Sequence, residues 1–260
     1  MGTDLDLAEK LIGKALALYP ENAEVQFICG RIMGQQAGDA IFSALSYAKK
    51  SLRCLKHAVA LQPDNTDYRR GLMSFYLNAP GIAGGDKQLA WQEVEQIALS
   101  DALQGKLAEL SFYRQTEQQQ KYRKLLAQCR SDYPGQAEFH YRHGLLLQQE
   151  QQFAPAFDAF YAATSASQDN DGIYVFNAWY QIGRTALFSQ QRIADGIYAL
   201  NHFIAKAPVS ADLPDLTWAH LRLAQLHKLN GNAAQMLQHL NEANQSNDKE
   251  LKREISRLQR

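Results

Sequence analysis

The chain has 260 residues and a formal net charge of zero, because 27 Lys and Arg residues are balanced by 27 Asp and Glu residues. Hydrophobic residues make up 46% and charged residues 21%, a balance that is typical of a folded protein and excludes a disordered one. Zero net charge provides no cationic surplus for phosphates, so we expect no nucleic-acid partner. No stretch approaches the roughly 18 to 20 continuous apolar residues of a membrane span.

The compartment is left open by the sequence. The N-terminus, Met1 to Asp6, has neither the basic start nor the apolar core of a signal peptide. Three cysteines, Cys29, Cys54 and Cys129, are too few and too scattered to predict a disulfide framework or a zinc site with CxxC spacing. Cytoplasmic and periplasmic locations therefore both remain open.

Helix is the expected secondary structure almost throughout. Ala, Leu, Gln, Glu and Lys dominate, and the chain has 7 Pro and 16 Gly. The segment 135–168 carries the clearest pattern of small and bulky residues. Its small residues are Gly144, Ala156 and Ala163, and its bulky residues are His140, His143, Leu147 and Phe160.

These offsets resemble the tetratricopeptide repeat (TPR), a helix-turn-helix unit of about 34 residues. In this family small residues at positions 8, 20 and 27 let helices pack closely, and large residues at 4, 7, 11 and 24 fill the remaining gaps. The register recurs along the chain, with prolines near the ends of the expected second helices at Pro20, Pro63, Pro134 and Pro208. The resemblance implies an all-α, right-handed superhelix, the TPR solenoid.

The expected elements form about six and a half repeats in one solenoid domain, 1–260. They are an isolated second helix at 4–20, repeats at 23–63, 66–101, 103–134, 137–168, 173–208 and 216–247, and a capping helix at 248–260. Extra residues predict long loops near Gly34 to Ser43 and over Ala79 to Asp86. The isolated helix leaves Leu7 and Leu11 without a first helix, so we hypothesise that a removed leader preceded this start.

The resemblance also implies a ligand groove, because TPR proteins line theirs with positions 2, 5, 9 and 12 of the first helices. Arginines and aromatic residues recur at these positions, which suits a protein or peptide that carries carboxylates. The candidate groove residues are Phe27, Arg31, Arg70, Ser74, Arg114, Tyr141, Gln148, Asn177, Tyr180, Arg184, Trp218 and Lys228. The alternative, an ordinary mixed surface, remains open.

One TPR specialisation is not expected. Chaperone-binding TPR domains hold a C-terminal Glu-Glu-Val-Asp with a clamp of Lys, Asn, Asn, Lys and Arg. The corresponding positions begin here with Phe27 and Arg31, then Arg70 and Ser74, and do not reproduce that clamp. We therefore expect no tight binding of this peptide.

The loop Ala79 to Asp86 contains the pattern AP-x-x-x-GG and resembles a loop in a group of bacterial TPR proteins of unassigned function. Pro80 should end a first helix, and Asp86 should cap the helix that begins at Lys87. Anion binding by the glycines is the alternative. The spacing matches neither GxGxxG nor GxxxxGK[ST], which favours a structural turn.

Chemistry-bearing residues are sparse elsewhere. The register places His140, His143, His220 and His227 at inward positions, where packing is the expected role rather than metal binding. Cys29 and Cys129 are expected to act as small buried hydrophobes. No GxSxG or HExxH motif occurs. The sequence therefore predicts a non-enzymatic adaptor without a cofactor or metal, and the alternative is a structural component that oligomerises through the solenoid ends or the long loops.

Overall fold

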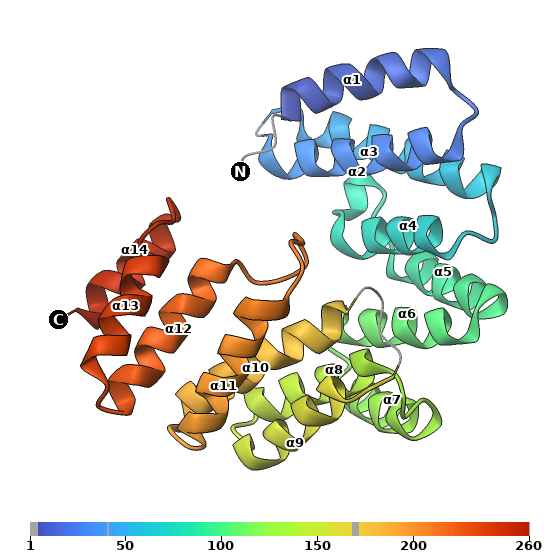
Figure 1. Ribbon diagram of the computed structural model, residues 1–260. Coiled ribbons are helices and arrows are strands. Elements are labelled where there is room, and N and C mark those ends of the chain that lie inside the picture. The colour runs from blue at the N-terminus through green and yellow to red at the C-terminus, as the bar shows by residue number, and fades with distance from the viewer. Residues whose placement is uncertain (1–4, 41, 168–171, 260) are drawn as a thin grey trace. The chain divides into compact units, whose positions relative to one another are not determined.

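The computed structural model describes residues 5–40, 42–167 and 172–259. Within these residues the chain forms fourteen α-helices and one short 3-10 helix, with no strand (Figure 1). The chain divides into two compact units, Met1–Leu125 and Leu126–Arg260. The expected segment ends at 4, 168 and 260 lie outside the described residues. One continuous solenoid over the whole chain stays a prediction.

The first unit contains α1 to α6, and the unit boundary falls within α7. The elements are α1 (Leu5–Leu18), α2 (Ala23–Asp39), α3 (Ala44–Leu61), α4 (Thr66–Asn78), η1 (Gly81–Ala83), α5 (Lys87–Ser100), α6 (Ala102–Gln115) and α7 (Gln119–Asp132). Consecutive helices from α1 to α6 pack on one another, and α4 also packs on α2 and α6. This neighbour-to-neighbour packing is the arrangement of a helical repeat.

The second unit continues the same scheme. Its remaining elements are α8 (Ala137–Gln149), α9 (Phe153–Thr164), α10 (Ile173–Ser189), α11 (Ile193–Lys206), α12 (Leu216–Leu229), α13 (Ala233–Ala243) and α14 (Lys249–Leu258). A Cβ on Gly144 would lie 2.5 Å from the Phe160 ring, and one on Gly183 would lie 2.3 Å from Leu200. The small residues of the repeat pattern therefore permit the close approach of α8 to α9 and of α10 to α11.

The expected long loop near Gly34 to Ser43 is wrong. Helix α2 continues through Gly34 to Asp39, and α3 begins at Ala44, so the extra residues lengthen the helices. Glycines lower helix propensity, but packing of α2 along α3 outweighs that cost.

The prediction about the cysteines also needs correction. Cys29 of α2 and Cys54 of α3 form a disulfide, with their Cα atoms 5.9 Å apart. Both are buried in one cluster with Ile12 and Met33. Cys129 is buried with a free thiol, in line with the packing role expected for it.

The loop Ala79 to Asp86 is a compact turn, as its residues predict. Helix α4 ends at Asn78, and the Asp86 carboxylate caps α5 by accepting hydrogen bonds from the backbone N–H groups of Gln88 and Leu89. Gly84 has a φ of 103°, which favours glycine. The Gly85 N–H donates to the Pro80 carbonyl over 3.1 Å. Each feature has a structural role, so the turn needs no anion to explain it.

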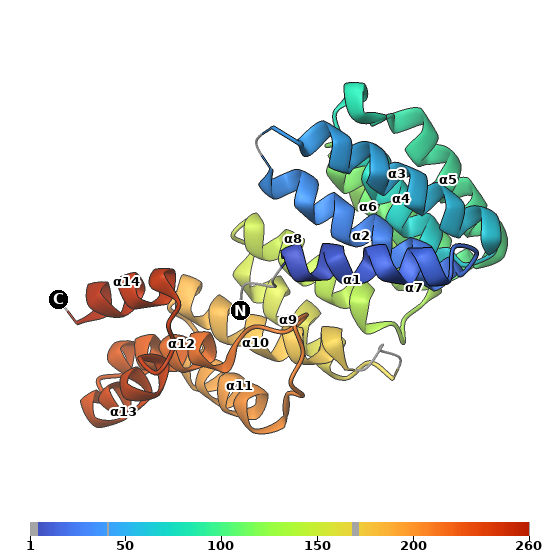
Figure 2. The same ribbon diagram turned by 90° about the horizontal axis from the view of Figure 1, so that it is seen from above.

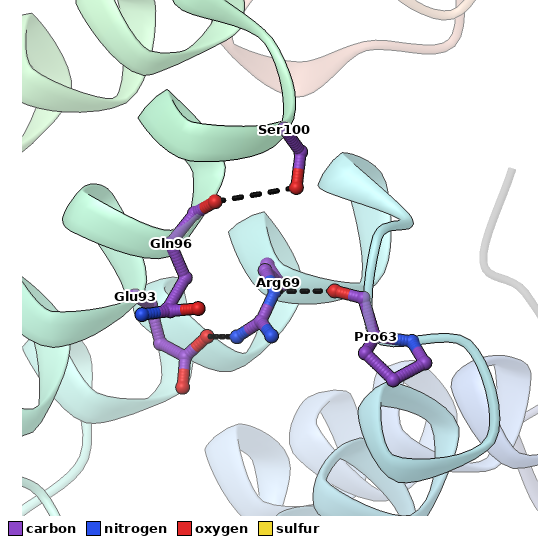
Figure 3. A network of polar contacts seen from close by, with 5 residues as sticks. All are labelled: Pro63, Arg69, Glu93, Gln96 and Ser100. Carbon is purple, nitrogen blue, oxygen red and sulfur yellow. Dashed lines mark hydrogen bonds and ion pairs between the residues drawn. The ribbon is translucent and has the colours of Figure 1, made fainter.

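A nearly buried ion pair joins α4 to α5. The Arg69 guanidinium donates to Glu93 Oε2 over 2.7 Å and to the Pro63 carbonyl over 2.5 Å, as Figure 3 shows. The side chains of Arg69 and Glu93 are 12% and 14% exposed. The pair therefore links α4 both to the next helix and to the turn that precedes it.

Helix α14 lies on α12 and α13 (Figure 2). Leu251 and Ile255 are buried there, while the rest of the helix is largely polar and solvent-exposed. This is the amphipathic stripe that the sequence predicts for the final segment.

Candidate functional site

A cavity of about 580 Å³ opens between α2, α3 and α4 in the first unit. Its volume falls in the range of ligand sites, which is roughly 300 to 1,000 Å³. Three of the predicted groove residues, Phe27, Arg31 and Ser74, line it. Phe75 and the start of the turn, Ala79 and Pro80, complete its walls.

The floor of this cavity, which we call the α2–α4 pocket, is created by missing side chains on α2. Gly30, Gly34 and Gly38 are four residues apart and so share one face of the helix. Because these three glycines carry no side chains, Ser51 and Leu55 of α3 reach the pocket behind α2. The Ser51 hydroxyl donates a buried hydrogen bond to the Gly30 carbonyl over 2.7 Å, which fixes α3 against α2.

Two phenyl rings provide the apolar walls. Phe27 packs against Tyr68 with ring centroids 4.8 Å apart. A Cβ on Gly71 would lie 2.6 Å from the Phe27 ring, so this glycine leaves the space that the ring occupies. Phe75 of α4 lines the same pocket. The pocket is therefore shaped to surround an apolar group.

The polar side chains of the pocket include Arg31, Ser74 and Asn78. Arg31 is the one charged side chain among the described lining residues, and its exposed guanidinium has no ion pair or hydrogen bond within the described structure. The Asn78 amide donates to the Ser74 carbonyl over 2.7 Å and to Ser74 Oγ over 3.2 Å. The Ser74 hydroxyl proton is thus available for a ligand acceptor, and the pocket favours an anionic group.

The other candidate residues of the first unit lie outside this pocket. Arg70 forms an ion pair with Asp67 at 3.2 Å and donates to Gln104 over 3.0 Å. Arg114 is exposed near the end of α6. The predicted row of arginines therefore contributes one residue, Arg31, to the pocket.

In the second unit several candidates take part in the internal structure. Tyr180 is buried and packs on Phe203, so we leave it out of the proposed site. Tyr141 is partly buried against Phe160, and Gln148 donates to Thr185 over 2.8 Å.

Arg184 also takes part in that internal structure. Its guanidinium lies over the Phe188 ring and donates to Gln181, and burial lowers its pKa. A guanidinium with these partners is less available to a ligand than that of Arg31.

The remaining candidates of this unit are held by neighbouring backbone or by α14. Asn177 donates to the carbonyls of Ile173 and Asp212. The Trp218 indole donates to Asp248 over 3.1 Å, and the Lys228 ammonium donates to the Leu258 carbonyl over 2.7 Å. Helix α14 thus occupies part of the surface that these two side chains would offer.

The pocket includes residues that the repeat register did not select. Ser51 and Leu55 belong to a second helix, and Ala79 and Pro80 belong to a turn. The glycines at 30, 34 and 38 were the signal in the sequence, because a bare helix face exposes the helix behind it.

The histidines lie in buried or partly buried places, as the register predicts. His140 contacts the Pro134 carbonyl at 2.8 Å, and His143 contacts Arg130 at 3.3 Å. His220 and His227 both pack on His239, which is not one of the inward positions expected from the repeat register. In the described part of the chain no three or more metal-ligating side chains are grouped to hold an ion.

None of the described helices is long and apolar enough to cross a bilayer.

Comparison with solved structures identifies the fold as that of a TPR-type helical repeat. A chain of the APC/C hetero-tetramer Cut9–Hcn1 is similar over 98% of this chain and 46% of its own length, with a TM-score of 0.60 and 12% identity. PilF of Pseudomonas aeruginosa matches over 99% of both chains, with a TM-score of 0.55 and 12% identity. Yeast Tom70 matches over 98% of this chain and 58% of its own length, with a TM-score of 0.54 and 14% identity.

The chain therefore spans less than two thirds of the length of the Cut9–Hcn1 and Tom70 chains that it matches. No protein-family model matches the sequence, and no curated protein matches it either.

Proposed function

We propose that this protein is a non-enzymatic adaptor that binds a protein partner through the α2–α4 pocket. The partner segment places a bulky apolar side chain between Phe27 and Phe75 and a carboxylate on Arg31. The observation that carries this proposal is the unpaired Arg31 guanidinium beside an apolar cavity with no acidic lining residue among those described.

Two interactions contribute to the free energy of binding. An apolar side chain that fills the pocket gains roughly 1.5 to 3 kcal/mol from leaving water. An ion pair of the exposed Arg31 guanidinium with a carboxylate adds roughly 0.2 to 1 kcal/mol, and the guanidinium can donate two hydrogen bonds to the carboxylate. Peptide segments are the partners that a TPR-type groove accommodates along a helix face.

The test uses an array of short synthetic peptides, each with one bulky apolar residue, made with and without a neighbouring carboxylate. Peptides that bind are titrated by fluorescence anisotropy. We expect Arg31→Glu to weaken the carboxylate-bearing peptides by about tenfold or more. Arg114→Glu is the matched control, because Arg114 is exposed in the same unit but outside the pocket, and it should leave affinity unchanged.

A second pair of variants tests the cavity itself. Gly38 lines the pocket and a Cβ there has no heavy atom within 4 Å, so Gly38→Phe starts a bulky side chain in free space at the pocket wall. Gly13 of α1 has the same free space but lies outside the pocket, so Gly13→Phe is its control. Equal peptide binding by both variants would contradict the proposal.

Self-assembly is a second candidate function, and the exposed apolar face of α1 favours it. Leu11 and Leu18 are 55% and 72% exposed. If this face joins two copies, light scattering should show a mass that rises with concentration, and Leu11→Asp with Leu18→Asp should remove that rise. A constant monomer mass for the unmodified chain would rule this function out.

The disulfide supports a location for the adaptor. Disulfides persist in oxidising compartments and are rare in the cytosol. Of the two compartments that the sequence leaves open, the Cys29–Cys54 bridge favours the periplasm. Recovery of the native protein from cells with this bridge reduced would contradict that location.

A further inference from the structure

Three histidines form one stack between α12 and α13 in the second unit. His239 of α13 lies between two histidines of α12, with ring centroids 5.3 Å from His220 and 5.4 Å from His227. The His227 and His239 rings are nearly parallel, at 10°. Both of these residues are buried, and His220 is partly buried.

The contact between His220 and His239 limits how many protons the stack can hold. Their Nδ1 atoms lie 3.0 Å apart, so one nitrogen donates a proton and the other accepts it. If both rings become fully protonated, both facing nitrogens carry hydrogens and the bond is lost. Two positive charges would then face each other at this distance.

His227 adds a further cost of protonation. Its buried Nδ1 has no hydrogen-bond partner. In a charged imidazolium this nitrogen would be an N–H donor with neither water nor an acceptor to bind. Burial lowers the pKa of His227 and of His220, and burial together with the charges of His220 and His227 lowers the pKa of His239 to about 4.

The charged groups around the stack do little to offset this cost. Glu242 of α13 is the acidic residue whose charge acts on the rings, where it opposes the lowered pKa values of His220 and His239.

Four charged residues on or next to the neighbouring helices interact with groups other than the three rings. Arg222 of α12 lies over Trp218 and donates to Gln225, Asp248 at the start of α14 accepts from Trp218, Asp195 of α11 pairs with Arg192, and Arg184 of α10 donates to Gln181.

From this geometry we propose that the His220–His227–His239 stack is an acid-sensitive latch, which holds α13 on α12 at neutral pH and releases it when the rings are protonated. Helix α14 depends on the latch, because it packs on both α12 and α13. Its buried Leu251 and Ile255 share one hydrophobic cluster with Leu221 and Leu240. Release therefore exposes apolar surface on α12, α13 and α14.

The direction of the pH effect follows from linkage. The folded pKa values lie below the ordinary histidine value of about 6.5, so the unfolded chain binds more protons. The stability that the neutral stack provides is fully present above about pH 6.5 and is lost as the pH falls toward the folded pKa of about 4. Between about pH 7.5 and pH 5 most carboxylates stay ionised, so histidine dominates this window.

Hydrogen exchange of the whole chain, read by mass spectrometry, tests the latch. After correction for the intrinsic rate, the opening constant of α12 to α14 should rise about tenfold or more between about pH 7.5 and pH 5. His239→Gln, which cannot titrate, should reduce that rise several-fold. His57→Gln is the control, because His57 lies on α3 in the other unit and outside the stack.

Two results of the exchange experiment would overturn the proposal. One is equal protection of α12 to α14 at both pH values in the unmodified protein. The other is an acid response that His239→Gln leaves intact. If His239→Gln does not fold, His220→Asn tests the same contact at the less buried end of the stack. In addition, a histidine titration of the unmodified protein by NMR must show the stack titrating below pH 6.5.

Discussion

The Ser51 hydroxyl donates a hydrogen bond to the Gly30 carbonyl across the contact of α3 with α2, at 2.7 Å and out of reach of solvent. The bond lies at the floor of the α2–α4 pocket, beside the Cys29–Cys54 bridge in the chain. The two helices can approach closely enough for this bond because Gly30 has no side chain. A Cβ on Gly30 would lie 2.5 Å from Leu55. The missing side chain of Gly30 therefore explains both the pocket and the close packing of α2 on α3.

Ser51→Ala should lower the free energy of unfolding by about 1 kcal/mol, because a buried hydrogen bond contributes about that much. Urea denaturation measures the change. Ser100→Ala is the matched control, since the Ser100 hydroxyl bonds to Gln96 at an exposed site (Figure 3). Equal effects of the two substitutions would contradict a structural role for Ser51.

The disulfide should be detectable by alkylation of the denatured protein before reduction. Cys129 alone should react, whereas all three cysteines should react after reduction. Reduction should destabilise the protein by about 3.5 kcal/mol, the chain-entropy value for closing a loop of this size. Cys29→Ser with Cys54→Ser should make stability insensitive to a dithiol reductant. Three reactive thiols before reduction would show that the bridge is absent.

The ion pair of Arg69 with Glu93 should be costly to break from one side. Arg69→Met leaves the Glu93 carboxylate without its partner, and the expected loss of stability is about 3 kcal/mol. Arg69→Met combined with Glu93→Leu should recover much of that loss, because no charge is then left unpaired. A double-mutant cycle measured by urea denaturation checks this, and purely additive losses would argue against the pairing.

Glycines at two kinds of site should respond to alanine in opposite directions. Gly144→Ala places a methyl group against the Phe160 ring and should cost roughly 1 to 3 kcal/mol. Gly13→Ala adds a methyl group with free space around it in α1 and should raise stability by roughly 0.5 to 1 kcal/mol. Thermal melts of the two variants make the comparison. A stabilising Gly144→Ala would contradict the close packing of α8 on α9.

Local patterns were enough to predict much of the fold. The small residues at Gly144 and Gly183 lie where one helix meets the next. Asp86 caps α5, and the Leu251 and Ile255 stripe of α14 is buried. Each of these features depends on a helical period or a capping geometry within a few residues, which the sequence displays directly.

The α2–α4 pocket was predictable in part. Position in the repeat selects Phe27, Arg31 and Ser74 because they project from the same side of the first helices. It does not select Ser51 or Leu55, which reach the pocket because α2 lacks side chains at Gly30 and Gly34. The expected loop over Gly34 to Ser43 was wrong for a related reason. The glycines weaken the helix locally, yet long-range packing on α3 holds it.

The sequence by itself determined that this protein is a stack of helix pairs with small residues at the contacts, because a periodic pattern admits few other ways of burying its apolar faces. The tertiary structure decided the pairings between distant residues: the Cys29–Cys54 bridge, the histidine stack, the burial of Tyr180 and the partners of Arg70. Each depends on distances across helices that no local pattern encodes. Those distances leave Arg31 unpaired beside an apolar pocket.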